Sequence, residues 1–133
     1  MNYDKLEKLV SESFEKKEQV GPKSDKKLVK AINETINLVD SGKIRVANKI
    51  NGNWVVNQWI KKAILLSFRI NKMEMMKGPY TTWYDKVPGK TVKWKEKDWK
   101  KAGYRHVPNG VVRKGAYLSL IHIWRCRRRV AGG

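Results

Sequence analysis

A chain of 133 residues with a formal net charge of +18 is long enough for one small domain and too short for two well-buried ones. It contains no run of eighteen apolar residues and begins with the polar segment MNYDKLEKL, so we expect a cytoplasmic protein without a membrane partner. Cys126 is the only cysteine and His106 and His122 are the only histidines, which excludes an internal disulfide and predicts no metal site.

The positive charge of the first 117 residues is carried mostly by lysine. This part contains 22 lysines and only four arginines, mixed with acidic residues. A charge of this size suggests nucleic acid, an anionic membrane or an anionic small molecule as a partner. Proteins that read nucleic acid more often concentrate arginine, whose planar guanidinium group fits phosphates and guanine edges. The composition therefore favours a general lysine bias.

Two amphipathic helices are predicted first. The helix over residues 3–18 has one apolar stripe, formed by Leu6, Leu9, Val10 and Phe14. Gly21-Pro22 ends this helix, because proline cannot continue it. Ser24 or Asp25 can cap a second helix that runs to about Asp40 and stops at Ser41-Gly42. Its apolar positions are Leu28, Ile32, Ile36, Leu38 and Val39.

A β-hairpin and a third helix follow. Residues 44–50 and 53–57 flank Asn51-Gly52, and this dipeptide is the strongest short-range hairpin signal. Residues 58–71 predict a helix with apolar side chains on two neighbouring stripes, so we expect it at the centre of the core. The two stripes are Trp59, Ala63, Leu66 and Ile70, and Ile60, Ile64 and Phe68.

The part of the chain after residue 71 has weaker signals. Residues 72–94 contain Gly78-Pro79 and Pro88-Gly89 and are interpreted as a loop with one short strand at 83–87. Residues 96–102 predict a short helix closed by Gly103, and residues 104–107 and 111–117 are expected to be extended. The sequence thus predicts an α+β fold: one small, mostly helical domain with a β-hairpin over residues 1–117.

The last sixteen residues, 118–133, differ from the rest in composition. They contain four arginines but no lysine and no acidic residue. One interpretation is a basic tail that binds nucleic acid or a membrane. We favour another, because LSLIHIWRCRR resembles a translated sequencing-library adapter in which a TGA codon is read as Trp124. The tail would then not be native, and removing four of the 18 net charges leaves +14 for residues 1–117.

The chain lacks the common catalytic motifs. It has no GxSxG, no P-loop, no dinucleotide-binding glycine pattern and no paired carboxylates in a defined relation. Tryptophans interleaved with lysines could stack on the bases of single-stranded nucleic acid, but packing at the edge of the core is the interpretation we favour. The tryptophans concerned are Trp54, Trp59, Trp83, Trp94 and Trp99.

Arg105 is the most specific candidate for a binding residue. It lies between an aromatic residue and a proline in the segment GYRHVP at 103–108, where its guanidinium group is well placed to bind a carboxylate in a forked geometry. The alternative is an ordinary surface salt bridge. His106 would point to the opposite face of an extended segment, so the two residues are not expected to share one role.

Several separated blocks resemble a single family. LVDSGKIRVANKINGNWVVNQWIKKAI (38–64), LLSFRIN (65–71), WYDKVP (83–88) and GYRHVPNGVVRKGAY (103–117) are similar in order and spacing to tetrahydrodipicolinate N-succinyltransferases, from about residue 9 to 117. In that family a helical N-terminal domain precedes a left-handed parallel β-helix. The hexapeptide repeats of the β-helix are absent from this sequence.

The resemblance implies an acyltransferase of lysine and diaminopimelate biosynthesis. Succinyl-CoA is its co-substrate, the acceptor amine derives from tetrahydrodipicolinate, and Arg105 falls at the family's substrate-binding arginine. The family's acid/base residues, CoA clefts and trimer contacts belong to the β-helix, so no catalytic or cofactor-binding residue is assigned here. We expect this chain to be an inactive, monomeric N-terminal part of a homotrimeric enzyme. The alternative is a small basic nucleic-acid-binding module.

Overall fold

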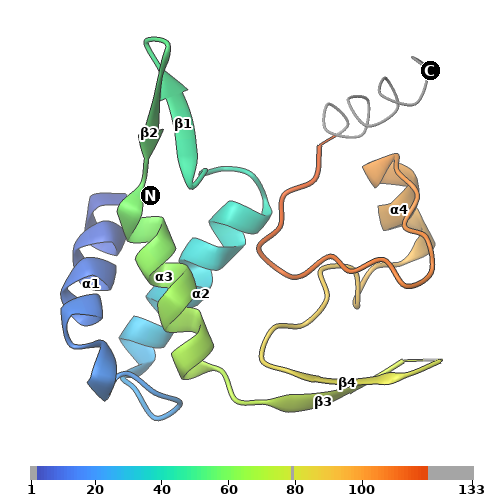
Figure 1. The fold of residues 1–133 in the computed structure, drawn as a ribbon, viewed down its shortest axis with the longest axis horizontal. Helices are drawn as coiled ribbons and strands as arrows, with labels where there is room; N and C mark the ends of the chain where they lie inside the picture. The colour runs from blue at the N-terminus through green and yellow to red at the C-terminus, as the bar shows by residue number, and fades with distance from the viewer. Residues whose placement is uncertain (1–2, 79, 120–133) are drawn as a thin grey trace.

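The computed structural model describes residues 3–78 and 80–119. Their elements, in chain order, are α1 (Tyr3–Glu15), η1 (Lys17–Gln19), α2 (Lys26–Asp40), β1 (Ala47–Ile50), β2 (Asn53–Val56), α3 (Gln58–Ile70), β3 (Glu74–Lys77), β4 (Thr82–Asp85) and α4 (Glu96–Ala102) (Figure 1). The predicted α+β class is confirmed. The described residues contain no left-handed parallel β-helix.

The core lies among the three long helices, each of which packs against the other two. The prediction that the third helix is central is confirmed, because Ile60, Ala63 and Leu66 of α3 are at most 1% exposed. The neighbouring helices contribute Val10, Leu28 and Ile32 to a buried cluster with Ala63, Leu66 and Ile70 of α3. Burying side chains of this size contributes about 1.5–3 kcal/mol each and is the main stabilising effect in the bundle.

An ion pair joins α3 to the turn after α1. The two terminal nitrogens of Arg69 donate to the two carboxylate oxygens of Glu18 at 3.3 and 3.1 Å, and one of them also donates to the carbonyl of Lys17 at 2.9 Å. A guanidinium group matches a carboxylate in this forked arrangement. The sequence predicted that the first helix reaches residue 18, but α1 ends at Glu15, because residues 17–19 form the tighter η1.

The second helix ends where the sequence predicts. The Lys43 N–H donates to the carbonyl of Leu38 and the Gly42 N–H to that of Val39, both at 3.0 Å. This pair of hydrogen bonds is a Schellman motif, which needs a residue with left-handed backbone after the helix. Gly42 supplies it with φ of +74°. The chain therefore leaves the last turn of α2 sharply and runs toward β1.

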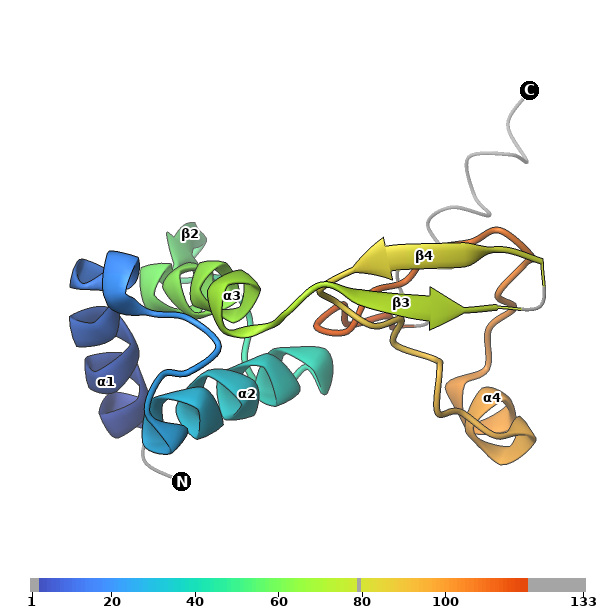
Figure 2. The same cartoon turned by 90° about the horizontal axis from the view of Figure 1, so that it is seen from below.

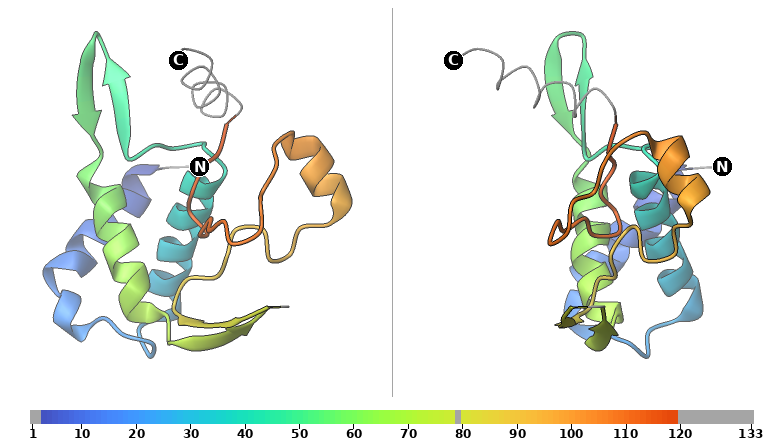
Figure 3. Two further views of the ribbon diagram at one scale, coloured as in Figure 1. Left: turned by 45° about the vertical axis from the view of Figure 1, so that its right-hand side comes forward. Right: turned by 90° about the vertical axis from the view of Figure 1, so that its right-hand side faces the viewer.

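The predicted hairpin is also confirmed. Asn51 and Gly52 both have positive φ, at 49° and 83°, as the type I′ turn between two short strands requires. At the base of the hairpin, the side-chain amide of Asn57 donates to the carbonyl of Arg45 at 2.7 Å. The main-chain N–H of Asn57 donates to the carbonyl of Val46 at 2.8 Å. All eight strand residues are exposed, and Figure 3 shows β1 and β2 projecting from the helices.

A second hairpin replaces most of the predicted loop. The sequence predicted one strand at 83–87, whereas the structure pairs β3 with β4 from Glu74–Asp85 to Lys77–Thr82. Gly78 makes this turn possible, since a Cβ at that position would lie 2.4 Å from the Trp83 ring. Figure 2 shows this hairpin on the side of the molecule away from α1.

The end of the described chain is less regular than predicted. The helix over residues 96–102 is confirmed, and Gly103 closes it with φ of +70°. Residues 104–107 and 111–117 form no strand, which corrects part of the extended prediction. The reason is that residues 111–117 do not pair with residues 104–107. They meet residues 88–90, through a single antiparallel bridge between Gly89 and Arg113.

Candidate functional site

Residues 91–111, which we name the 91–111 loop, form one excursion that contains α4 and Arg105. Main-chain hydrogen bonds close its base: the Lys90 N–H donates to the Val112 carbonyl at 2.8 Å, and the Lys114 N–H donates to the Pro88 carbonyl at 3.0 Å. The Gly89–Arg113 bridge lies between them. We name residues 88–90 and 112–115 the base of the loop.

Asp40 connects this base to the C-terminal end of α2. Lys90 Nζ lies 2.7 Å from Asp40 Oδ2 and also donates to the Asp40 carbonyl at 3.0 Å. The Gly115 N–H donates to Asp40 Oδ1 at 2.8 Å. The side chains of Lys90 and Asp40 are 11% and 26% exposed, so solvent screens this pair less than the ion pairs on the surface. Sequence patterns predicted neither residue.

A second contact lies beside the first. The Arg45 guanidinium group stacks over the Tyr117 ring at 4.2 Å, a cation–π geometry. The same ring lies against Gly42, where a Cβ would come within 2.6 Å of it. The segment that follows the 91–111 loop is thus held against the turn after α2.

The aromatic residues of the 91–111 loop pack on one another. The ring centroids of Trp94 and Trp99 are 4.9 Å apart, and Tyr104 lies 6.1 Å from each of them. His106 lies 5.7 Å from Trp99. Offset and edge-to-face contacts of this kind stabilise a small cluster beyond the apolar area that it buries. The cluster gives the loop a packed interior although α4 has only seven residues.

The tryptophans do not form one continuous platform. Trp59 is buried in the helical bundle, and Trp94 and Trp99 pack together, as the packing interpretation predicted. Trp54 and Trp83 lie on two different hairpins and are 71% and 49% exposed, so that interpretation was wrong for them. A surface that stacks successive bases needs its rings along one groove.

Tyr104 belongs to the aromatic cluster and is influenced by the charge of Asp40. Its hydroxyl group is buried and has no hydrogen-bond partner in the described part of the chain. Burial raises the pKa of the Tyr104 phenol, and the negative charge of Asp40 raises that pKa further. The phenol therefore stays neutral near physiological pH and places no second negative charge near Asp40.

Arg105 does not belong to the aromatic cluster that its two neighbours join. Its side chain is exposed and makes no hydrogen bond or ion pair with any residue of 3–78 or 80–119. Tyr104 and His106 both pack on Trp99, whereas Arg105 has no ring contact among the described residues. His106 Nε2 lies 2.9 Å from the Gly110 carbonyl. The ordinary salt bridge considered for Arg105 does not form within these residues.

The surroundings of Arg105 are electropositive. Between residues 91 and 111 the chain has six lysines or arginines against two acidic residues. Glu96 pairs with Lys100 at 2.8 Å, and the Asp98 carboxylate accepts a hydrogen bond from the Lys95 N–H at 2.8 Å. Both acids are therefore engaged locally. The uncompensated cations favour an anionic ligand at the exposed face of the loop.

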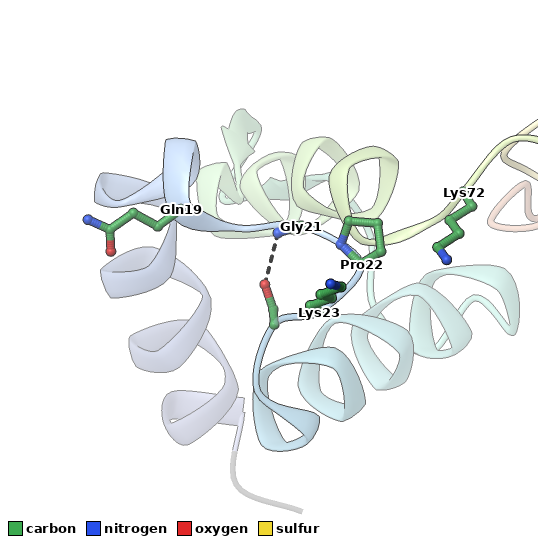
Figure 4. Close-up of a pocket in the computed structure, with 6 residues that line it drawn as sticks. Gln19, Gly21, Pro22, Lys23 and Lys72 are labelled. Carbon is green, nitrogen blue, oxygen red and sulfur yellow. Dashed lines mark hydrogen bonds between the residues drawn. The ribbon is translucent and has the colours of Figure 1, made fainter.

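A hollow in the surface lies elsewhere, between the turn before α2 and the end of α3 (Figure 4). It has a volume of about 390 Å³ and is lined by Gln19, Gly21, Pro22, Lys23, Ser24 and Lys72. The Ser24 hydroxyl already accepts the Gly21 N–H at 2.9 Å. Two exposed lysines without further converging groups make this a weaker candidate than Arg105.

Among residues 3–78 and 80–119, no three histidine, cysteine or acidic side chains are grouped closely enough to hold a metal ion. None of the helices in the same part of the chain is long and apolar enough to cross a bilayer. Residues 120–133, which include His122, Cys126 and most of the segment 118–133 predicted to be non-native, lie outside the described residues.

Comparisons with known proteins give one consistent answer. Residues 5–70 match a family model described as tetrahydrodipicolinate N-succinyltransferase N-terminal. The chain is 49% identical over 116 residues to a 2,3,4,5-tetrahydropyridine-2,6-dicarboxylate N-succinyltransferase of Pelagibacter ubique, and 46% identical over 117 residues to that of Agrobacterium fabrum. These alignments cover 85% and 86% of this chain but 42% and 41% of the relatives.

The class of protein follows from these matches and from the fold. The helices α1, α2 and α3 and the first hairpin coincide with the residues that match the N-terminal model of an N-succinyltransferase family. The chain belongs to the tetrahydrodipicolinate N-succinyltransferase family, as the blocks between residues 38 and 117 predicted. It spans about 42% of the length of the curated relatives that it matches.

Proposed function

We propose that this chain is the N-terminal part of an enzyme that transfers the succinyl group of succinyl-CoA to tetrahydrodipicolinate. In this proposal its task is to bind the acceptor, a dicarboxylate, in a step of lysine and diaminopimelate biosynthesis. The observation that carries the proposal is the exposed guanidinium group of Arg105, which has no partner among the described residues, in a chain whose relatives are named for this reaction.

Arg105 would act by orientation. A guanidinium group offers two parallel N–H donors that match the two oxygens of a carboxylate, so it fixes the direction of the bound group as well as its position. Holding the acceptor in this way lowers the entropic part of the barrier to acyl transfer. The neighbouring lysines would attract the dianionic acceptor to the loop.

Transfer itself would require more than the described residues provide. His106 packs on Trp99 with its Nε2 near the Gly110 carbonyl, which leaves it poorly placed to accept a proton from an amine bound at Arg105. We therefore propose that the acid/base groups and the binding cleft for succinyl-CoA lie in residues that the longer relatives contain, in a cytoplasmic homotrimer. Residues 1–133 alone should release no thiol from succinyl-CoA above a control without protein.

The binding role is testable with dipicolinate, the stable aromatic analogue of the acceptor, titrated calorimetrically into the purified chain. Arg105→Ala should weaken binding by about tenfold or more, because a hydrogen-bonded charge pair contributes about 1.5–3 kcal/mol. Arg105→Lys should recover only part of the affinity, since an ammonium group cannot form the fork.

The matched control is Lys97→Ala, which removes another exposed cation from the 91–111 loop. It should change the affinity by less than about threefold at moderate salt, because it acts only through screened long-range attraction. Equal losses in the Arg105 and Lys97 variants would reject a specific role for Arg105 and leave only non-specific attraction of anions.

A further inference from the structure

We infer that Asp40 is a positioning residue for Arg105: it holds the base of the 91–111 loop on α2 and thereby fixes the segment that presents the guanidinium group. The inference rests on the proposed function of Arg105 as the carboxylate-binding side chain. Asp40 lies 65 positions before Arg105 in the sequence and would act on it only through the fold.

The first observation is the place of Asp40 in its own helix. It is the last residue of the 15-residue α2, and the last turn of this helix contains no basic side chain. The C-terminal end of a helix carries a partial negative charge, which an acidic side chain opposes. Asp40 is therefore unfavourable for α2 taken alone, and a reason for an acid at this position must lie in its contacts outside the helix.

The second observation is that those contacts all go to the base of the loop. One carboxylate oxygen pairs with Lys90 Nζ at 2.7 Å, and the other accepts the Gly115 N–H at 2.8 Å. Lys90 and Gly115 belong to the two chain segments that close the loop, one before it and one after it. A single side chain thus fixes both ends of the loop to the helical bundle.

The third observation connects the base with Arg105. Tyr104, the residue before Arg105, buries its hydroxyl group and is influenced by the charge of Asp40, while its ring packs on Trp94 and Trp99. The side of the segment that faces the protein is therefore determined by packed contacts. Arg105 follows directly on this packed residue and is itself exposed, so the place of its backbone depends on the contacts of Tyr104.

Asp85 is a weaker candidate for the same role. Its carboxylate pairs with Arg113, which also lies in the base. That pair, however, joins the base to β4, whose hairpin is itself exposed, and the Arg113 side chain is 50% exposed. Asp40 is the carboxylate that attaches the base to the packed helices.

The test uses the whole chain with Asp40→Ala, the conservative Asp40→Asn and a control, Glu18→Gln. Glu18 is also paired with a cation, Arg69, but on the η1 side of the bundle. In Asp40→Ala, amide hydrogen exchange at Gly115 and Lys114 should accelerate about tenfold or more, and the amide resonance of Arg105 should shift. Asp40→Asn keeps an acceptor for Gly115 and should show an intermediate effect. Glu18→Gln should show neither change.

Two further measurements separate positioning from general stability. The unfolding midpoint of the helices in Asp40→Ala should change little, because the removal of an unfavourable charge from the end of α2 offsets the loss of the pair with Lys90. Dipicolinate binding should weaken at least about fivefold, and Asp40→Ala combined with Arg105→Ala should bind no more weakly than Arg105→Ala alone, as expected when one residue acts through the other. Additive losses in the double variant would overturn the inference.

The two proposals can fail independently. If the unmodified chain does not bind dipicolinate, the proposed function of Arg105 fails, while the exchange and resonance measurements still decide whether Asp40 controls this segment. If Asp40→Ala leaves Gly115 exchange and the Arg105 resonance unchanged, the positioning inference is wrong whatever the affinity of the chain for dicarboxylates.

Discussion

Gly42 is the position where a single methyl group should report on the attachment of the C-terminal segment. Its φ is +74°, and a Cβ there would lie 2.6 to 2.8 Å from three atoms of the Tyr117 ring. Gly42→Ala therefore has two costs. The left-handed backbone costs about 1 kcal/mol for a residue with a side chain. The displaced ring also loses its contact with Arg45, which is worth about 0.5–1 kcal/mol.

A double-mutant cycle with Tyr117→Ala separates the two costs. Gly42→Ala should lower the free energy of unfolding by about 2 kcal/mol in the unmodified chain and by about 1 kcal/mol when the ring is absent. Urea unfolding followed by far-ultraviolet circular dichroism measures both values under the same conditions. The coupling of about 1 kcal/mol is then the contribution of the ring contact.

If Gly42→Ala lowers the free energy of unfolding equally with and without the Tyr117 ring, the ring does not occupy the space beside Gly42. That result would refute the predicted coupling. A neutral Gly42→Ala would refute the left-handed backbone as well. A loss with Tyr117→Ala alone of about 0.5–1 kcal/mol is expected, since a partly exposed cation–π contact is lost.

Two further predictions concern the core and the pH dependence. Leu66→Ala removes a side chain that is 0% exposed and should cost about 3 kcal/mol in unfolding free energy, whereas Leu65→Ala, at 53% exposure on the same helix, should cost less than about 1 kcal/mol. Similar losses in both variants would contradict the assignment of the core. The hydrogen bond from Arg113, together with the backbone N–H of Lys86, lowers the pKa of the Asp85 carboxyl below its usual 3.8. Above pH 3.8 the ion pair between Asp85 and Arg113 therefore contributes fully to stability. This contribution is lost as the pH falls through the lowered pKa. In an NMR titration, Arg113→Ala should return the Asp85 midpoint toward 3.8, and an unchanged midpoint would show that the pair does not form.

Local signals in the sequence were sufficient for the helical part and the first hairpin. The apolar stripes of residues 58–71 identified α3 as central because helical periodicity and burial coincide there. Asn51-Gly52 identified the first hairpin because both residues adopt the positive φ that its turn requires. The second hairpin was missed because Gly78-Pro79 and the run MEMM give no alternation of apolar and polar residues.

The candidate site was only half predictable for a physical reason. Arg105 could be singled out because a lone arginine in an extended polar segment has few local roles. Asp40 could not, since its partners Lys90 and Gly115 are 50 and 75 positions away, and no local pattern encodes such a contact. One signal was available: an acid in the last turn of a helix that has no basic residue there opposes the helix dipole and thus indicates a partner elsewhere.

The two hairpins have a consequence for how the chain behaves at high concentration. Each sheet in the described part of the chain has only two strands. Every strand therefore has one edge whose main-chain groups pair with no other strand of that part. Such edges can pair with a second molecule and begin aggregation, and the first hairpin adds the exposed Trp54. Lys49 in β1 and Lys77 in β3 oppose this pairing, because two copies would bring like charges together. The lysine excess should therefore also help to keep these edges apart in solution.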